Sequence, residues 1–396
     1  MTEVDWHKCR FLESSENLKP LVQRRFGRQP STSIAREIAA CLQQGRLFYQ
    51  AATSSPLEIR PLQQFYGMVG FSKALVIARH CRSLSTLRPA HGLKDISVPN
   101  GRIAELRVRI KDAGTFQDFN DVVAELTRIC YIDSSTSSRS ISIPSTKADQ
   151  LCTIELSLRE ILSRIPDLES LYRMTFHEDA LTHLILLEDV AFHSLEPLIE
   201  NTPSWDDENF HIRIDVSERF SDRDSVKQIV THLREKFPFL TSWRLVSAQR
   251  AWDHSIIRFR NRRNSGIDEF SEERLRPQEG GFEGIDFVNE QTVTFPLVEG
   301  FYPVAGGYTG KCSAISPVNG CYFSEFSLHY LALFLLSSLV RYRPETWIHA
   351  ISRSVMSEAP ADDQALSLIE RFLDLNGSVI PGMVVTVLNP DEDRFS

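Results

Sequence analysis

The sequence has 396 residues, which is too long for one small hydrophobic core and, at about 150 residues per domain, predicts two or three packed units. Hydrophobic residues make up 42% of the chain and charged residues 24%, a globular composition that excludes global disorder. The formal net charge of -8 excludes a general attraction to nucleic acid or anionic lipid, because the average field repels phosphate groups. Any such binding must come from a local basic patch.

Cysteine and histidine spacing gives no sign of a disulfide framework or a metal site. The seven cysteines are scattered and include no CxxC pair, which is typical of reduced thiols in a cytosolic protein. Histidines and carboxylates gather between His177 and His193, but without an HExxH or 2-His-1-carboxylate spacing. The first eleven residues lack the apolar stretch of a signal peptide. We therefore expect a cytoplasmic protein with no metal and no cofactor.

Residues 1–133 are predicted to form a mainly helical N-terminal region. Helix-capping residues at Pro30–Ser33 precede apolar residues that recur near every 3.6 positions to about Ala52. A second helix should begin near Pro61 and run to about Arg79. Because it is apolar nearly all round, we expect it at the centre of the N-terminal core. Its glycines, Gly67 and Gly70, should permit close helix packing.

A strand and a third helix follow in the same region. Residues Glu105–Lys111 alternate strictly between apolar and polar, mostly basic, side chains, which predicts a half-buried strand with a basic outer face. Thr115 and Asp118 resemble a capping box and open a helix that runs to about Leu126. Residues 134–146, SSTSSRSISIPST, are too polar to offset the entropy cost of ordering, so we expect a Ser-rich loop or linker there.

Residues 147–322 are predicted to form a mixed α+β middle region. Ser157 should cap a short helix that ends near Arg164. The alternation pattern then predicts strands at Leu184–Phe192, His211–Val216, Trp243–Ala248, Ser255–Phe259 and Gln291–Val298, and a helix at about Asp224–Lys236. A strand, helix, strand, strand order indicates a mixed sheet covered on one face. Residues 300–320 are rich in Gly and Pro, and we expect a turn between sheet and helix.

Residues 323–396 are predicted to be a helical C-terminal region. Its helices should span about Ser324–Tyr342, Pro344–Val355 and Asp362–Leu375, with Asn376 and Gly377 as the last C-cap. The most apolar window, Leu328–Val340, is shorter than the roughly 20 residues of a membrane span, so we interpret it as a buried helix and expect no membrane association.

Several stretches together resemble the YaaC-like family of bacterial proteins. They are PLEIRPLQQFYGMVGFSKAL (Pro56–Leu75), HGL (His91–Leu93), GTFQDF (Gly114–Phe119) and HYLALFLLSSLVRYRPETW (His329–Trp347). The resemblance implies one continuous architecture in a bacterial, cytosolic protein, and it brings no catalytic residues with it. Because the stretches lie toward opposite ends, we expect an α+β fold whose N- and C-terminal helices pack together around or beside the middle sheet.

The first candidate site pairs Arg343 with His349. Their Arg-x5-His spacing resembles that of HEPN-type ribonucleases, which are helical and metal-independent. In such a site the histidine acts as general acid or base on a ribose 2'-hydroxyl, and the arginine stabilises the charge on the reacting phosphate. Alternatively, Arg341 and Arg343 form salt bridges at the end of the preceding helix, where cations are favoured.

A second candidate is a basic cluster at the end of the predicted sheet. Arg258, Arg260, Arg262 and Arg263 lie near Trp252 and Phe259, and arginines with stacking aromatics are typical of single-stranded nucleic-acid contact. Asp268, Glu269, Glu272 and Glu273 follow and could neutralise the cluster within the fold. AGGYTGKC at residues 305–312 echoes a phosphate loop, but Ala305 and Cys312 replace its first Gly and its Ser/Thr.

The lack of a catalytic constellation favours a non-enzymatic interaction or regulatory protein, with a bacterial stress or phage-defence module as its setting. We expect a protein partner or a homodimer, and nucleic acid only through the Arg-rich patch. The alternative is a HEPN-like, metal-independent ribonuclease that uses Arg343 and His349.

Overall fold

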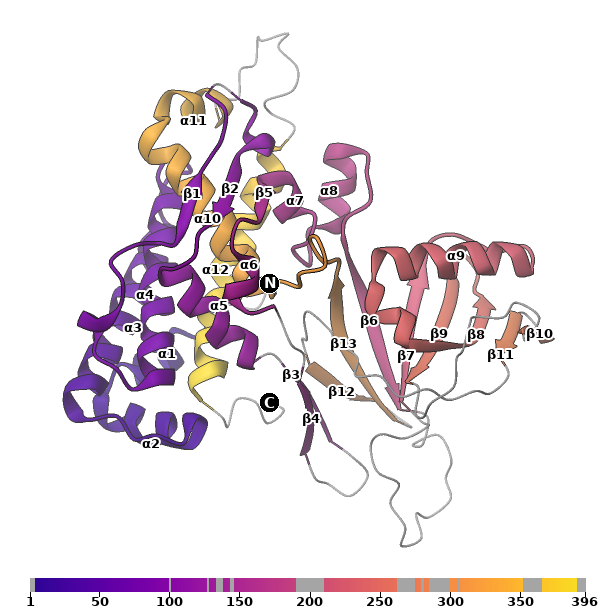
Figure 1. Ribbon diagram of the computed structural model, residues 1–396, viewed down its shortest axis with the longest axis horizontal. Coiled ribbons are helices and arrows are strands. Elements are labelled where there is room, and N and C mark those ends of the chain that lie inside the picture. Colours follow the sequence, from indigo (N-terminus) through magenta and orange to yellow (C-terminus); the bar gives the residue numbers. More distant parts are fainter. Residues whose placement is uncertain are drawn as a thin grey trace, which may run out of the picture. The chain divides into compact units, whose positions relative to one another are not determined.

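The computed structural model describes residues 4–99, 101–126, 128–132, 138–142, 146–189, 210–261, 275–278, 281–284, 300–304, 307–351 and 365–389 (Figure 1). The chain forms two compact units. The helical unit comprises residues 1–126, 145–180 and 323–396, and the sheet unit comprises residues 127–144 and 181–322. Helices at both ends of the chain and a sheet in its middle confirm the predicted α+β class.

The helical unit is built from helices of all three of its segments. The first segment carries α1 (Trp6–Leu12), α2 (Ser15–Phe26), α3 (Thr32–Thr53), α4 (Arg60–His80) and α5 (Thr115–Leu126). The second carries α6 (Ala148–Leu151), α7 (Leu158–Leu162) and α8 (Glu169–Phe176). The third carries α10 (Glu325–Tyr342), α11 (Pro344–Ile351) and α12 (Leu366–Leu388). Short 3-10 turns lie at Leu84–Thr86 and Ile103–Glu105.

Glycines bring α3 and α4 into close contact at the centre of this unit. A Cβ on Gly70 would lie 3.0 Å from the backbone nitrogen of Gly45, and one on Gly67 would lie 2.6 Å from the ring of Tyr49. A larger residue at either position would therefore require the Tyr49 ring or the backbone of α3 to shift. The prediction that Gly67 and Gly70 permit close packing is confirmed, and α4 is buried around most of its circumference.

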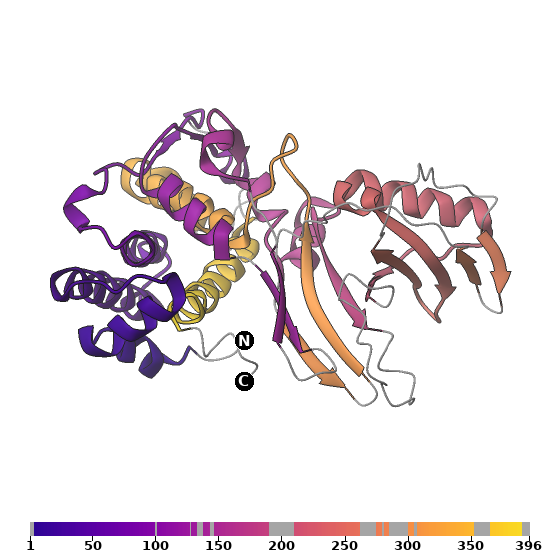
Figure 2. The same ribbon diagram turned by 60° about the horizontal axis from the view of Figure 1, so that its bottom comes forward.

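The C-terminal helices pack against α4, which confirms that the two ends of the chain pack together. Phe65 of α4 lies 5.8 Å from Tyr330 and 6.0 Å from Phe334 of α10, measured between ring centroids. Both views show α12, drawn in yellow, among the N-terminal helices (Figures 1 and 2). Tyr330 also contacts the rings of Phe116 and Phe119 from α5, so one aromatic cluster joins α4, α5 and α10.

Helix α12 does not end where the sequence predicted. Instead of capping at Asn376 and Gly377, it continues through Pro381 to Leu388. The reason is that Asn376 is fully buried: its side-chain oxygen accepts a hydrogen bond from the Tyr49 hydroxyl at 2.9 Å, and its amide nitrogen lies 3.1 Å from His329 Nδ1. Among the described residues α12 is also the one helix long and apolar enough to cross a membrane, and 61% of its apolar window is buried.

A small antiparallel sheet completes the helical unit. Its order is β1-β2-β5, with β1 at Leu93–Asp95, β2 at Arg107–Ile110 and β5 at Glu155–Ser157. Side chains alternate along β2 as predicted, with Val108 and Ile110 buried and Arg107 and Arg109 exposed. Ser157 then forms a full capping box with Glu160 at the start of α7, in agreement with the predicted cap.

The sheet unit contains an eight-stranded sheet in the order β10-β11-β8-β9-β7-β6-β13-β12. Its strands are β6 (Thr182–Asp189), β7 (Phe210–Val216), β8 (Trp243–Arg250), β9 (Ser255–Asn261), β10 (Leu275–Gln278), β11 (Gly281–Gly284), β12 (Gly300–Val304) and β13 (Gly307–Ile315). Helix α9 (Arg223–Lys236), followed by a 3-10 turn at Pro238–Ser242, covers one face through Val226, Val230 and Leu233 (Figure 2).

The strand directions correct the predicted mixed sheet, because every described pair is antiparallel. The β7-α9-β8 sequence is the kind of crossover that usually joins parallel neighbours. Here, however, β9 follows β8 through a tight turn and inserts between β7 and β8, so both strands pair antiparallel with β9.

Two loop predictions in or near the sheet unit are also corrected. Part of the Ser-rich stretch forms strand β4 (Ser138–Ser142), which pairs with β3 (Arg128–Ile132). Residues 307–312 of AGGYTGKC lie in β13, where Thr309–Cys312 pair with β6, so they form neither a phosphate loop nor a turn into a helix. Backbone groups used in a ladder are not free to cradle phosphate. The strand predicted at residues 291–298 lies outside the described residues.

The two units divide the chain at different positions from the predicted ranges 1–133, 134–146, 147–322 and 323–396. Residues 145–180 belong to the helical unit, because β5 completes the small sheet beside β2, and residues 127–144 belong to the sheet unit.

Candidate functional site

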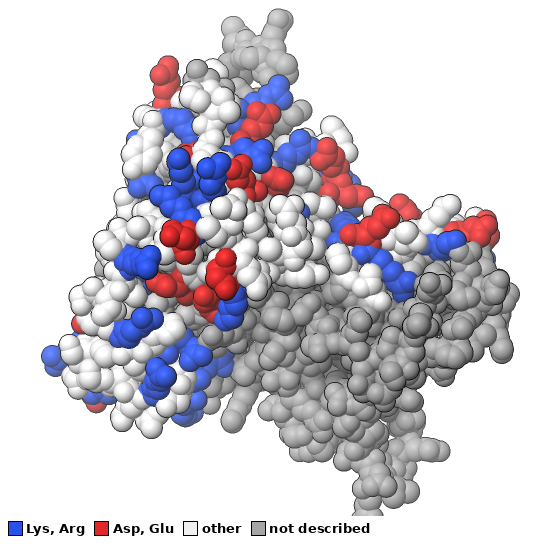
Figure 3. All heavy atoms as spheres, viewed as in Figure 1, with Lys and Arg blue, Asp and Glu red and all other residues white. Residues whose placement is uncertain are grey.

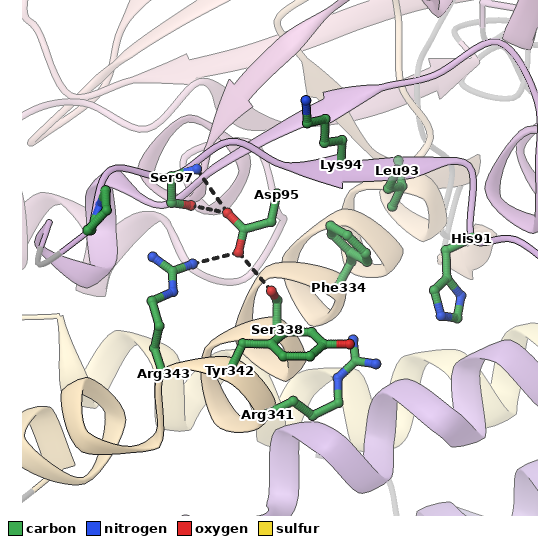
Figure 4. A pocket seen from close by; sticks show the side chains of 11 residues that line it. His91, Leu93, Lys94, Asp95, Ser97, Phe334, Ser338, Arg341, Tyr342 and Arg343 are labelled. Carbon is green, nitrogen blue, oxygen red and sulfur yellow. Dashed lines mark hydrogen bonds and ion pairs between the residues drawn. The ribbon is translucent and has the colours of Figure 1, made fainter.

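A pocket of about 670 Å³ lies between β1 and the C-terminal half of α10, within the helical unit (Figure 4). The β1 side contributes His91, Leu93, Lys94, Asp95, Ser97 and Pro99. The α10 side contributes Phe334, Ser338, Arg341, Tyr342 and Arg343. Small-molecule sites in proteins commonly have volumes of roughly 300–1,000 Å³, so this pocket has the size of a ligand site.

Local backbone geometry explains which side chains face the pocket. Phe334, Ser338 and Arg341 are spaced at i, i+4 and i+7, which places them on one face of α10. Along β1, Leu93 is buried and Asp95 is half-buried, whereas Lys94 between them is exposed. Asp95 can therefore reach α10, whereas Figure 4 shows the Lys94 side chain pointing away from α10, on the other side of β1.

Asp95 joins the two sides of the pocket. Its carboxylate accepts hydrogen bonds from the Ser97 backbone nitrogen at 2.9 Å, the Ser338 hydroxyl at 2.7 Å and the Arg343 guanidinium at 2.5 Å. Burial alone would raise the pKa of Asp95, but the hydrogen bonds from Ser97 and Ser338 and the charge of Arg343 outweigh burial and lower that pKa. Asp95 is therefore held ionised.

The structure gives Arg343 a defined structural partner. Arg343 is the C-cap residue of α10, and it pairs with Asp95 while both side chains are only about 20% exposed. His349 lies on α11, is exposed and does not line the pocket. The two residues of the Arg-x5-His candidate thus do not share this pocket, and the ion pair of Arg343 agrees with the alternative interpretation of a salt bridge at the helix end.

Two other cations of the pocket have no acidic partner among the described residues. Arg341 donates to the backbone oxygen of Ser337 at 3.2 Å, and its guanidinium carbon lies 5.0 Å from the ring centroid of Tyr342 and 5.7 Å from that of Phe65. Lys94 is exposed and makes no ion pair with any residue that the structure describes. Arg343 is neutralised by Asp95, so Arg341 is the pocket cation that remains without an acidic partner among the described residues, while Lys94 points to the outer face of β1 beside Arg109.

The side chain of His91 lines the pocket as a neutral imidazole. Its half-buried ring packs against Phe65 at 5.1 Å and Phe334 at 6.2 Å between centroids. Burial, followed by the charges of Arg341 and Lys73, lowers the pKa of His91 below its ordinary value. At neutral pH the imidazole therefore carries one donor and one acceptor nitrogen, and neither forms a hydrogen bond with a described residue.

The His91–Leu93 segment is held in place by the start of α5. Gly92 has a φ of +77°, and a Cβ there would lie 1.7 Å from the side-chain oxygen of Gln117. The amide nitrogen of Gln117 donates to the backbone oxygens of Gly92 and Lys111, each at 2.8 Å, and the backbone nitrogen of Phe116 donates to the oxygen of His91 at 3.0 Å. Only glycine fits between them.

The outer face of the β1-β2-β5 sheet adds further positive charge beside the pocket. Arg107 and Arg109 are exposed, and Arg109 pairs with Glu155 on the neighbouring strand. Figure 3 shows basic side chains over β1 and β2, with acidic side chains beside them. This face is therefore mixed in charge, whereas the pocket beneath it has an excess of positive charge.

The predicted basic cluster is only partly within the described residues. Arg258 lies on β9 and donates to the side-chain oxygen of Gln249 at 2.8 Å. Arg260 is also in β9, and Arg262 and Arg263 lie outside the described residues. Phe259 is fully buried, so it cannot stack on a base, whereas Trp252 is 92% exposed at the β8-β9 turn.

Fold and pocket together define an α+β protein with a positively charged, ligand-sized pocket in a unit assembled from both ends of its chain. Residues 10–388 match the family model described as YaaC-like Protein, so the chain belongs to the YaaC-like family, and the resemblance seen in the sequence is confirmed. Comparison with curated proteins and with solved structures finds no match.

Sequence reasoning missed His91, Asp95 and Arg341 as pocket residues. Two of the family-like stretches, HGL and HYLALFLLSSLVRYRPETW, each carry polar residues, and in the structure these stretches meet at the pocket. Polar residues within the family-like stretches were therefore the sequence feature that could have indicated the pocket. A third, Pro56–Leu75, supplies Phe65, whose ring contacts both His91 and Arg341.

Proposed function

We propose that this protein is a non-enzymatic, cytosolic regulatory component that binds a small anionic ligand in the β1-α10 pocket. The observation that carries the proposal is Arg341, a cation that lines the pocket without an acidic partner among the described residues. An unpaired cation in a partly enclosed pocket is a ready partner for phosphate or carboxylate oxygens.

The arrangement of the pocket favours binding over turnover. Arg343 and Asp95 neutralise each other and connect α10 to β1, so they fix the walls of the pocket. A ligand that contacts both Arg341 on α10 and His91 immediately before β1 would add a second connection between the same two sides of the pocket. Ligand binding would then stabilise the helical unit by mass action and could alter its surface for a protein partner or a second copy of the chain.

The test is thermal unfolding of the full-length protein in inorganic phosphate, compared with chloride at equal ionic strength. We expect phosphate to raise the midpoint, and Arg341→Met, which keeps the apolar stem, to weaken phosphate binding about tenfold or more. Arg107→Gln, on the outer face of the same sheet, is the matched control and should bind as wild type. A phosphate effect no larger than that of chloride, or one unchanged in Arg341→Met, contradicts the proposal.

The alternative function is a HEPN-like ribonuclease using Arg343 and His349. The observation in its favour is that Arg343 lines the pocket, where its guanidinium could approach a phosphate. His349, the residue that would transfer the proton, is exposed on α11. If the protein cleaves RNA, His349→Ala should abolish cleavage, and unchanged cleavage in that variant removes this alternative.

A further inference from the structure

We propose that the ligand of the β1-α10 pocket is a nucleoside monophosphate. This inference rests on the proposed function and names the chemical class of the anion. It combines three features of the pocket that lie next to one another: the Arg341 guanidinium, which has no acidic partner among the described residues, an exposed aromatic ring, and a neutral histidine without a hydrogen bond to any described residue.

The charge of the pocket is suited to one phosphate monoester rather than to a nucleic-acid strand. Such a group carries about -1.5 to -2 charges near pH 7. Arg341 supplies a positive charge without an acidic partner among the described residues, while Arg343 is already paired with Asp95. A nucleic-acid strand would instead be expected to follow a row of cations. This guanidinium therefore favours a single terminal phosphate.

The aromatic side of the pocket is suited to a nucleobase. The Tyr342 ring is 71% exposed although it lines the pocket, and the guanidinium of Arg341 lies 5.0 Å from its centroid. Figure 4 shows the ring beside Arg341, with Phe334 of the same helix α10 and Leu93 of β1 on the other side of Ser338 from them. An exposed ring next to a guanidinium stacks favourably on a planar base, whichever base it is.

His91 supplies the polar contact that a nucleoside requires. Its ring lines the pocket with one donor and one acceptor nitrogen at neutral pH, and both are available to a ribose hydroxyl or to the edge of a base. Its ring plane is fixed by contacts with Phe65 and Phe334, so the imidazole is oriented before a ligand arrives.

The test is calorimetric titration of the full-length protein with AMP, GMP, CMP and UMP, compared with ribose 5-phosphate and inorganic phosphate. We expect each nucleotide to bind about tenfold or more tightly than ribose 5-phosphate, because base stacking adds to the phosphate contact. Tyr342→Leu should weaken nucleotide binding about tenfold and ribose 5-phosphate binding much less, whereas Tyr342→Phe, which keeps the ring beside Arg341, should retain nucleotide binding. Tyr66→Leu, an exposed tyrosine on α4 outside the pocket, is the matched control.

The outcomes separate this inference from the proposed function. If phosphate and ribose 5-phosphate bind with dependence on Arg341 but a base adds no affinity, the anion site stands and the nucleotide assignment is wrong. If no anion binds, both are wrong. Tighter binding of a 5'-phosphorylated oligonucleotide than of every mononucleotide would overturn the assignment in favour of an RNA end.

Discussion

Asp95 determines the geometry of the pocket, although nothing in its local sequence marks it. Its partners Ser338 and Arg343 are 243 and 248 residues away in the chain, and strand alternation indicates only that Asp95 points to the side opposite Lys94. Arg343 was predicted as a candidate catalytic residue because of its spacing from His349. The structure shows that its guanidinium already has a carboxylate partner, which spacing along the chain could not reveal.

Removing the charge of Asp95 should destabilise the helical unit in a pH-dependent way. Because hydrogen bonds lower the pKa of Asp95 in the folded state, its contribution is present above the unfolded pKa and is lost as pH falls through the folded pKa. We expect Asp95→Asn to lower the free energy of unfolding by about 1–2 kcal/mol at pH 7, since the pair is partly solvent-screened. Urea denaturation measures this difference.

The loss should shrink toward zero as pH falls below the ordinary pKa of an aspartate and then through the lowered pKa of folded Asp95. Asp112→Asn, at an exposed position beyond β2, is the matched control and should change stability little at any pH. A loss for Asp95→Asn that stays constant from pH 7 into the acid range would show that the charge of Asp95 is not what stabilises the site.

At the scale of elements, the periodic patterns predicted most helices and strands, and the exceptions have identifiable causes. Helix α9 follows an apolar periodicity, helices α4 and α10 were predicted from nearly continuous apolar residues, and the burial of all three agrees with these patterns. The Ser-rich β4 and the Gly-rich β13 were missed because ladder hydrogen bonds from β3 and β6 order segments that composition alone would leave as loops. Asn376 and Gly377 in α12 were misinterpreted as a C-cap because the hydrogen-bond partners of the Asn376 side chain lie far away in the sequence, on α3 and α10.

Gly377→Ala distinguishes the observed continuous α12 from the predicted cap. A Cβ at Gly377 would lie 3.4 Å from the amide nitrogen of Gln64, which is ordinary contact, and Ala favours a helix interior by about 1 kcal/mol over Gly. We therefore expect Gly377→Ala to raise the free energy of unfolding by up to about 1 kcal/mol in urea denaturation. At a left-handed cap the same change would be destabilising.

Gly92→Ala is the informative comparison for that variant. It places a Cβ 1.7 Å from the Gln117 side-chain oxygen at a φ of +77°, so it should be clearly destabilising and should disturb His91. If Gly377→Ala lowers stability as Gly92→Ala does, α12 ends near Asn376 as the sequence first indicated.

At the scale of the whole molecule, the helical unit depends on contacts between segments far apart in the chain. The sequence predicted that the ends pack together because the family-like stretches lie toward both ends, and the α4-α10 contacts confirm it. The sequence could not predict that residues 145–180 join the same unit. Strand β5 has only three residues, which is too short for a pattern of alternating side chains, and Leu156 is buried because β5 pairs with β2.

A chain that ends at Tyr322 should lose the helical unit and keep the sheet unit. It lacks α10, whose six fully buried leucines contribute about 1.5–3 kcal/mol each, a sum comparable to the roughly 5–15 kcal/mol stability of a whole domain. Phe65 of α4 would be left without Tyr330 and Phe334. The sheet unit retains both of its segments, residues 127–144 and 181–322.

Limited proteolysis with mass spectrometry should therefore find α4 cleaved and α9 protected in this shorter chain, whereas both helices should be protected in a chain that ends at Asn389. Protection of α4 in the shorter chain would mean that the N-terminal helices fold without the C-terminal ones. Helix α10 would then complete the pocket on a helical core that folds without it.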